Sequence, residues 1–174
     1  MKRTLLLLLA AAGLVSCNTN GPSGPTVATT PTGGSEAFND QDFAWSQASG
    51  GDSIDGQLGY TAGGGKFTCQ GGDVVLTPMT PWSRRRMIIL YGSDSKAAVT
   101  ADDVRAHAAQ APAGDYARYA RKVTCDAASH FSFSGLPDGS WYVITLATPV
   151  AGGQKVAVMH RVETRGGAKH VTLN

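Results

Sequence analysis

Hydrophobic and polar residues alternate most clearly within residues 123–147. Phe131 and Phe133 alternate with serines, and residues 141–146 continue the same two-residue period. This period predicts two β-strands, because successive side chains of a strand point to opposite faces. Residues 136–139, Leu-Pro-Asp-Gly, predict a turn between them, since proline presets φ and glycine tolerates positive φ. An all-β core is therefore expected here.

Shorter alternating or apolar segments predict further strands. These segments are residues 53–61, 66–77, 87–91, 155–163 and 169–173. Gly71-Gly72 indicates a bulge or tight turn within the second of them. A hairpin around Gly166-Gly167 is expected to pair the last two, with Val162 opposite Val171 and His160 opposite Leu173. About seven short strands with Gly-rich turns predict an Ig-like β-sandwich.

One helix is expected, over residues 100–111. Thr100 provides an N-cap with Asp103 at the third position, and positions 104, 107, 108 and 111 form an apolar-facing stripe. Pro112 and Gly114 end the pattern. The predicted sandwich thus carries one short helical insertion.

Residues 1–16 are predicted to be a secretory signal. Lys2 and Arg3 precede an apolar run, residues 5–15, that is too short to span a bilayer. The sequence Leu-Val-Ser-Cys at residues 14–17 resembles the lipobox of bacterial lipoproteins, which implies that Cys17 becomes the acylated (palmitate-bearing) first residue. Several acyl chains make such a membrane anchor effectively permanent. A chance cysteine in an ordinary signal peptide, or an uncleaved anchor, is the alternative.

The expected location is the outer membrane, with the domain facing the periplasm or the surface. Asn18 follows Cys17, whereas the inner-membrane retention signal of enteric bacteria has aspartate there. Removal of the leader leaves 13 basic and 13 acidic residues, so the mature chain has no formal net charge. Nothing in this balance attracts nucleic acid.

The chain is expected to divide into the signal, a lipidated linker over residues 17–45 and a domain over residues 46–174. Residues 18–34 are mostly Gly, Pro, Ser and Thr, a composition that cannot form a core. Residues 36–55 contain five acids, no base and three aromatic residues. This stretch is either a docked arm of the domain or more of the linker.

Cys69 and Cys125 remain as an even pair once Cys17 carries lipid. A disulfide is expected between them, because the envelope permits disulfides. The two cysteines lie 56 positions apart, so the bond would stabilise the fold by about 4 kcal/mol in the loop-entropy model. Two separate thiols are the alternative.

Several segments resemble a carboxypeptidase regulatory-like domain, a transthyretin-like (prealbumin-like) sandwich. Residues 131–143 match its aromatic strand, Leu-Pro-x-Gly corner and aromatic-ended strand. Residues 53–57, 74–78 and 171–173 are similar to its first, second and last strands. Ser129-His130 departs from the usual glycine, and residues 87–122 are an insertion. The resemblance implies a non-catalytic spacer, binding or display module and carries over no functional residue.

Residues 81–86, Pro-Trp-Ser-Arg-Arg-Arg, are the candidate ligand-binding stretch. Arg84, Arg85 and Arg86 would hold an anionic glycan or lipid head group while Trp82 stacks on a sugar. The alternative is a solvated strand edge on which arginines discourage aggregation. Two other tryptophans offer stacking surfaces, Trp45 and Trp141, of which Trp141 is expected in the core.

No catalytic residue, metal or cofactor is expected. The four histidines, at positions 107, 130, 160 and 170, lack metal-ligand spacing. Ser93 and Lys96 match Ser-x-x-Lys, but the companion motifs of that serine hydrolase class are absent. The leading hypothesis is a non-enzymatic, lipid-anchored envelope protein that binds or braces another envelope component. A module that binds carbohydrate, cell wall or lipopolysaccharide through Trp82 and Arg84–Arg86 is the second, and a small serine hydrolase the third.

Overall fold

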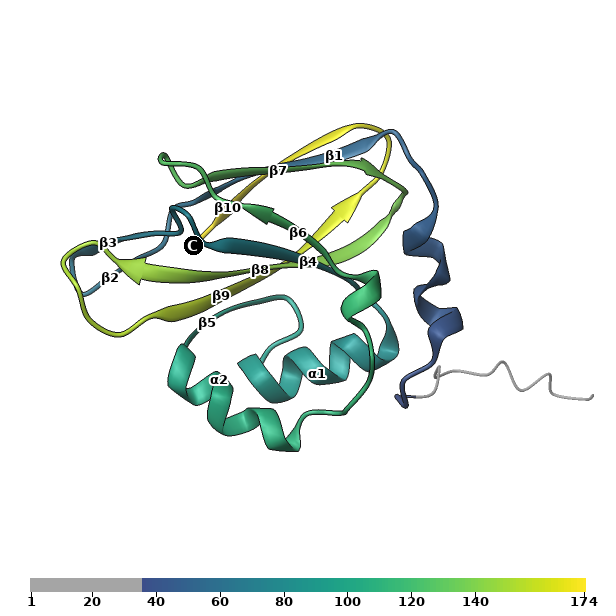
Figure 1. Ribbon diagram of the computed structural model, residues 1–174, viewed down its shortest axis with the longest axis horizontal. Helices are drawn as coiled ribbons and strands as arrows, with labels where there is room; N and C mark the ends of the chain where they lie inside the picture. The colour runs from purple at the N-terminus through teal and green to yellow at the C-terminus, as the bar shows by residue number, and fades with distance from the viewer. Residues whose placement is uncertain (1–35) are drawn as a thin grey trace, which may run out of the picture. The chain divides into compact units, whose positions relative to one another are not determined.

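The computed structural model describes residues 36–174, which form two β-sheets packed face to face. The small sheet has the order β10-β1-β7, formed by β1 (Asp52–Leu58), β7 (His130–Leu136) and β10 (Ala168–Leu173). Its central strand, β1, runs parallel to β10 and antiparallel to β7. Figure 1 shows this sheet along the upper side of the view. The predicted all-β sandwich is confirmed.

The large sheet is built around β8 (Gly139–Pro149). Its other strands are β2 (Thr61–Ala62), β3 (Gly65–Thr68), β4 (Asp73–Pro78), β5 (Lys96–Thr100), β6 (Arg121–Thr124) and β9 (Val156–Thr164). One edge of β8 pairs with β4 and β3, and the other pairs with β9, which in turn pairs with β5. The segment predicted as one strand over residues 66–77 is thus two strands, separated at Gly71-Gly72.

The core lies between the sheets and is built by the alternating pair of strands that the sequence singles out. Phe131 and Phe133 of β7 point inward and are at most 5% exposed. Trp141 and Val143 of β8 meet them from the large sheet and are fully buried. The predicted Leu-Pro-Asp-Gly corner carries the chain from one sheet to the other. The expected place of Trp141 in the core is therefore confirmed.

Helix α1 (Pro81–Tyr91) covers the outer face of the large sheet (Figure 1). It begins at a capping box, in which Ser83 N–H donates to Thr80 Oγ1 at 3.1 Å and Thr80 N–H donates to Ser83 Oγ at 2.8 Å. Met87 packs from the helix against β8 and β9. The strand predicted over residues 87–91 is wrong, because a short apolar run alone does not distinguish a strand from a buried helical face.

The predicted insertion helix is confirmed and lies beside α1. Helix α2 (Ala101–His107) continues into a short 3-10 helix, η2 (Ala108–Gln110). Thr100 is its N-cap, since its hydroxyl accepts from the N–H of Asp103 at 3.1 Å and donates to that residue's carboxylate at 2.7 Å. A further 3-10 turn, η3 (Ala117–Tyr119), precedes β6. No helix within residues 36–174 is long and apolar enough to cross a membrane.

The acidic aromatic stretch is a docked arm of the domain, so the folded unit begins before residue 46. Its 3-10 helix η1 (Asp40–Gln47) buries Phe43 completely. Phe38 and Phe43 contact the Trp82 ring of α1, with centroids 5.3 and 6.0 Å away. Such aromatic pairs stabilise beyond their buried area by about 1 kcal/mol each. The predicted signal, Cys17 and the rest of the linker lie outside the described residues.

The hairpin predicted around Gly166-Gly167 is wrong. Strand β9 already pairs on both edges, with β8 and β5. Strand β10 instead crosses to the small sheet and pairs in parallel with β1. The positive φ of both glycines, 70° and 133°, permits this change of direction. Consequently Val162 does not pair with Val171, and His160 does not pair with Leu173.

We expect His160 to make folding stability depend on pH. Its imidazole is only 8% exposed, and its Nε2 lies 3.0 Å from the Asn174 carbonyl oxygen. Burial lowers the pKa of His160 below its usual 6.5. The unfolded chain therefore binds this proton more readily than the folded one, so the stability present above pH 6.5 decreases as pH falls.

Urea unfolding at pH 7.5 and pH 5.5 measures this effect. The wild-type midpoint should be lower at pH 5.5, and His160→Gln should reduce the difference, whereas His107→Gln, at an exposed position, should leave it unchanged. Asp40 and Asp94, whose pKa values their arginine partners lower, should stay charged in this window. An identical pH difference in His160→Gln and wild type would contradict the prediction.

Candidate ligand-binding face

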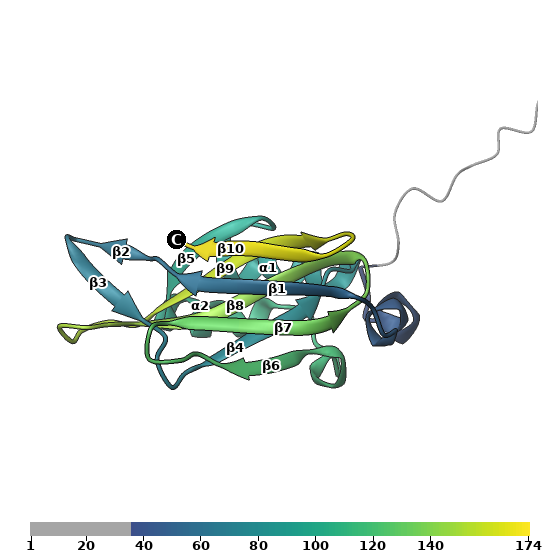
Figure 2. The ribbon, with the colours of Figure 1, turned by 90° about the horizontal axis from the view of Figure 1, so that it is seen from above.

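The outer face of the small sheet carries a cavity of about 620 Å³. Polar side chains line it in two rows that run across the three strands. In the first row Asp55 lies between Ser132 and His170, and in the second Gln57 lies between His130 and Thr172. Figure 2 looks onto this sheet, and no described element lies in front of it. The face is therefore open to a ligand.

The two-residue period of β1 divides its side chains between the core and this face. Ile54 and Leu58 point inward and are at most 5% exposed. Gly56 also points inward, and a Cβ there would lie 2.1 Å from the ring of Phe131. Only glycine therefore lets this ring pack against the central strand. Asp55 and Gln57 alternate to the outer face.

Hydrogen bonds hold the first row in place. Ser132 Oγ donates to Asp55 Oδ1 at 2.7 Å, and Ser53 Oγ donates to Asp55 Oδ2 at 3.4 Å. Asp55 is half-buried, and it forms no ion pair within residues 36–174. In the second row Gln57 Nε2 donates to the Ala128 carbonyl at 3.5 Å. The Gln57 carbonyl stays available to accept from a ligand.

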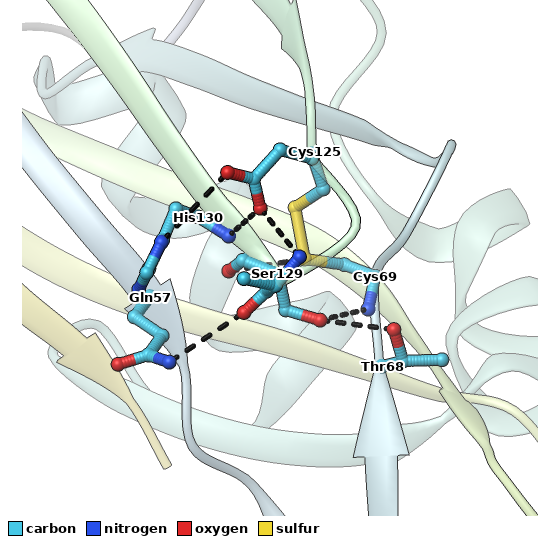
Figure 3. A network of polar contacts seen from close by, with 8 residues as sticks. Gln57, Thr68, Cys69, Cys125, Ser129 and His130 are labelled. Carbon is cyan, nitrogen blue, oxygen red and sulfur yellow. Dashed lines mark hydrogen bonds and ion pairs between the residues drawn. A yellow bond between two sulfur atoms is a disulfide. The ribbon is translucent and has the colours of Figure 1, made fainter.

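The loop between β6 and β7 forms one wall of the cavity. Asp126 Oδ1 accepts from the N–H groups of Ala128 and His130, both at 2.8 Å. Ser129 has φ = 62°, a left-handed conformation that is unfavourable for a residue with a side chain. Its hydroxyl lies 2.9 Å from Thr68 Oγ1 and accepts from Cys69 N–H at 3.3 Å (Figure 3). These bonds hold a strained residue at the edge of the cavity.

The predicted disulfide between Cys69 and Cys125 is confirmed, and it anchors this loop (Figure 3). Both cysteines are at most 3% exposed. Backbone bonds support the link on either side, since Gly71 N–H donates to the Cys125 carbonyl at 3.0 Å and Cys125 N–H to the Gly72 carbonyl at 2.9 Å. The wall that carries Asp126 and His130 is thus fixed to the large sheet.

Trp82, predicted to stack on a sugar, is fully buried. It lies on the inner side of α1 with Phe38, Phe43 and Tyr116, and its indole N–H donates to the Ala113 carbonyl at 3.2 Å. The prediction that Trp82 stacks on a sugar is wrong, because its ring is buried. The alternative of a solvated strand edge is wrong too, since the segment is a helix. Trp45 is likewise occupied, packing on Trp141 with ring centroids 4.9 Å apart.

The three arginines separate around α1. Arg86 Nη1 donates to the Pro112 carbonyl at 2.9 Å, and its guanidinium lies over the ring of Trp82. Arg84 pairs with Asp94 at 2.5 Å, and Arg85 pairs with Glu36. Arg84 and Arg85 also line a second cavity, of about 810 Å³. Their role in ligand binding stays a prediction.

The structure does not bring the Ser-x-x-Lys residues together as a catalytic pair. Ser93 Oγ accepts from the backbone N–H of Lys96 at 3.3 Å, but Lys96 Nζ donates to Asn174 Oδ1 at 2.5 Å. Within residues 36–174, no group of three or more His, Cys, Asp or Glu is placed to hold a metal.

Sequence reasoning missed all six side chains of the two rows. The polar positions of β1 and β7 were visible as the outer half of an alternating pattern. Their alignment, however, depends on the parallel pairing of β1 with β10, which joins segments more than 100 residues apart. A hairpin of β9 with β10 places His170 elsewhere, so the wrong topology concealed the site.

No family model and no curated protein matches the chain. Among solved structures, the chain is similar to a candidate carbohydrate-binding protein from Pseudomonas aeruginosa, with a TM-score of 0.58 and 21% sequence identity. The match covers 78% of this chain and 96% of that chain. The likeness shows a shared fold. The resemblance to carboxypeptidase regulatory-like domains stays a prediction.

Removal of the disulfide should destabilise the domain strongly. Cys69→Ala with Cys125→Ala opens a link across 56 positions, and the unfolding free energy should fall by about 4 kcal/mol, measured by urea unfolding. Reductant should lower the stability of the wild type similarly and leave the double variant unchanged. A loss below about 1 kcal/mol would show that the native contacts hold the loop without the bond.

Proposed function

We propose that the domain is a carbohydrate-binding module and that its ligand lies on the outer face of the small sheet. The observation that carries this proposal is the convergence of six polar side chains, in two registered rows, on one uncovered cavity. Saccharides present several hydroxyl groups in fixed directions, and each can both donate and accept. An array of carboxylate, amide, hydroxyl and imidazole groups suits such a ligand.

Each row offers a distinct kind of contact. Because Ser132 donates to Asp55, its oxygen lone pairs remain free to accept from a sugar hydroxyl. Asp55 itself accepts sugar hydroxyls in charge-assisted bonds, which are about twice as strong as neutral ones. Gln57 and Thr172 extend the polar surface toward the next sugar ring. The ligand therefore meets acceptors at Asp55 and Ser132, and groups that can both donate and accept at His170 and in the second row.

Hydrogen bonds, and not ring stacking, carry the binding in this proposal. The aromatic residue at the cavity, Phe131, is 5% exposed and belongs to the core. Individual hydrogen bonds contribute about 0.5–1.5 kcal/mol each, so affinity depends on several of them acting together. The fold shared with the candidate carbohydrate-binding protein from Pseudomonas aeruginosa supports this ligand class.

We further propose that the module is non-enzymatic and is held on the outer membrane through acylated Cys17. The leader and the cysteine at residues 14–17 support this anchor, and the Gly- and Pro-rich composition of residues 18–34 supports a tether. The ligand is then a glycan of the cell envelope or of its surroundings. A carboxypeptidase regulatory-like origin of the sandwich accords with a display role.

Removal of two side chains of this face should weaken glycan binding without unfolding the domain. Gln57→Ala combined with His170→Ala deletes two exposed groups and should weaken binding on a glycan array about tenfold or more. The matched control, Gln110→Ala with His107→Ala, removes the same residue types from the helical layer and should bind normally. Thermal melting should be unchanged in both.

Unchanged glycan binding in the Gln57→Ala, His170→Ala variant would show that the ligand does not bind at the face of the small sheet. If array binding were instead lost on changing Arg84 and Arg85 to alanine, the second cavity would be the site. Recovery of one protein partner by crosslinking in cells, with no glycan bound, would favour a bracing role.

Cys17→Ser should release the protein from membranes. Without acyl chains the chain loses its anchor, so the variant should appear in the soluble periplasmic fraction after ultracentrifugation. Asn18→Ser, which keeps the cysteine, is the control and should fractionate with membranes. A Cys17→Ser protein that still sediments with the outer membrane would contradict the lipobox interpretation.

A further inference from the structure

We infer that the saccharide bound at this face is neutral or carries a free amine, and that acidic saccharides are excluded. This inference rests on the proposed function and names its ligand class. Among the described residues that line the cavity are two carboxylates, Asp55 and Asp126, and no lysine or arginine. A sulfate, phosphate or uronate group brought to this face would meet this negative charge, with no lysine or arginine of the lining to compensate it.

Of the two carboxylates, Asp55 is the less exposed and so the less screened by water. It occupies the central strand and is half-buried, and its two oxygens accept from the hydroxyls of Ser132 and Ser53. Hydroxyl donors stabilise a carboxylate but do not neutralise it. Because burial reduces screening by water, this charge acts strongly on any ligand atom placed above β1.

Asp126 adds a second negative charge, and hydrogen bonds hold its side chain in one orientation. Its Oδ1 is held by two backbone N–H groups, and the loop is fixed by Ser129 and the disulfide. Its Oδ2 lies 3.8 Å from Nδ1 of His130, the cavity residue that faces it. The carboxylate is therefore presented toward the cavity from the wall while Asp55 is presented from the floor.

Basic side chains of the neighbouring strands are directed to other partners. Arg121 of β6 donates to backbone carbonyls, including that of Ser46 at 3.1 Å, and Lys122 pairs with Asp73 at 3.0 Å. Lys169 precedes His170 on β10 and alternates to the opposite side of that strand. The paired arginines of α1 belong to the other cavity. None of these groups offsets the two carboxylates.

One acidic group on the saccharide should weaken its affinity about tenfold relative to the neutral form. This is the size expected from one unfavourable charge contact at a partly solvated site. An amine should be tolerated or bound more tightly, because it meets the same carboxylates with the opposite sign. This charge preference is the reverse of the one that the arginine triplet suggests from the sequence.

The test is a glycan array carrying chito-, cello- and malto-oligosaccharides, each in neutral, amine-bearing and sulfated forms. The folded wild-type domain should bind neutral or amine-bearing members of at least one series, with the sulfated member about tenfold weaker. Asp55→Asn with Asp126→Asn keeps the shape and one acceptor oxygen of each side chain but removes both charges. It should reduce the affinity difference between neutral and sulfated members to about twofold. Asp115→Asn, an exposed acid beside the helical layer, is the matched charge control and should retain the full difference.

The possible outcomes distinguish failure of the charge preference from failure of carbohydrate binding. A sulfated member that binds as tightly as its neutral counterpart overturns the inference and leaves carbohydrate binding intact. Discrimination that persists in the folded double variant also overturns it, since other groups must then cause the effect. Absence of binding to every series overturns the proposed function itself. If melting shows the double variant unfolded, Asp55→Asn alone provides the comparison, with a partial narrowing expected.

Discussion

The central position of β1 in the small sheet is the constraint on which the rest of the structure depends. This strand pairs with β7, about 75 residues later in the chain, and with β10 at the chain's C-terminal end. Its inward residues meet the large sheet, and Gly56 gives Phe131 the space to pack there. Its outward residues form the middle of both polar rows. One strand therefore joins the core to the candidate site.

Local features made much of the fold predictable from the sequence. The alternation around Phe131 and Trp141, the Pro-Asp-Gly corner between them and the cap at Thr100 each depend on residues close in the chain, and all appear in the structure. The disulfide followed from counting cysteines, given the expectation of an oxidising compartment. Features that depend on a few neighbouring residues, or on counting cysteines, could thus be predicted from the sequence.

The failures share a different cause, which is competition between distant segments. The apolar run from Met87 suits a strand or a helix when it is taken alone, and its packing over β8 and β9 is what the helix satisfies. Strand β10 follows β9 closely enough for a hairpin, yet both edges of β9 are occupied. Trp82 is buried because Phe38 and Phe43 of the N-terminal arm pack against it, and the sequence left open whether this arm docks. The site was missed because it exists only after β10 has crossed between sheets.

The disulfide contributes to recognition as well as to stability. A hydrogen-bonding face without stacking aromatics gains affinity only if its groups are already in place, because ordering them on binding would cost free energy. The sheet fixes Asp55, Gln57 and His130 through its ladder, whereas Asp126 depends on a loop. That loop is held by the Cys69–Cys125 bond and by the strained Ser129, whose hydroxyl bridges to the strand before Cys69. The same link that stabilises the fold therefore also preorganises the loop that forms one wall of the cavity.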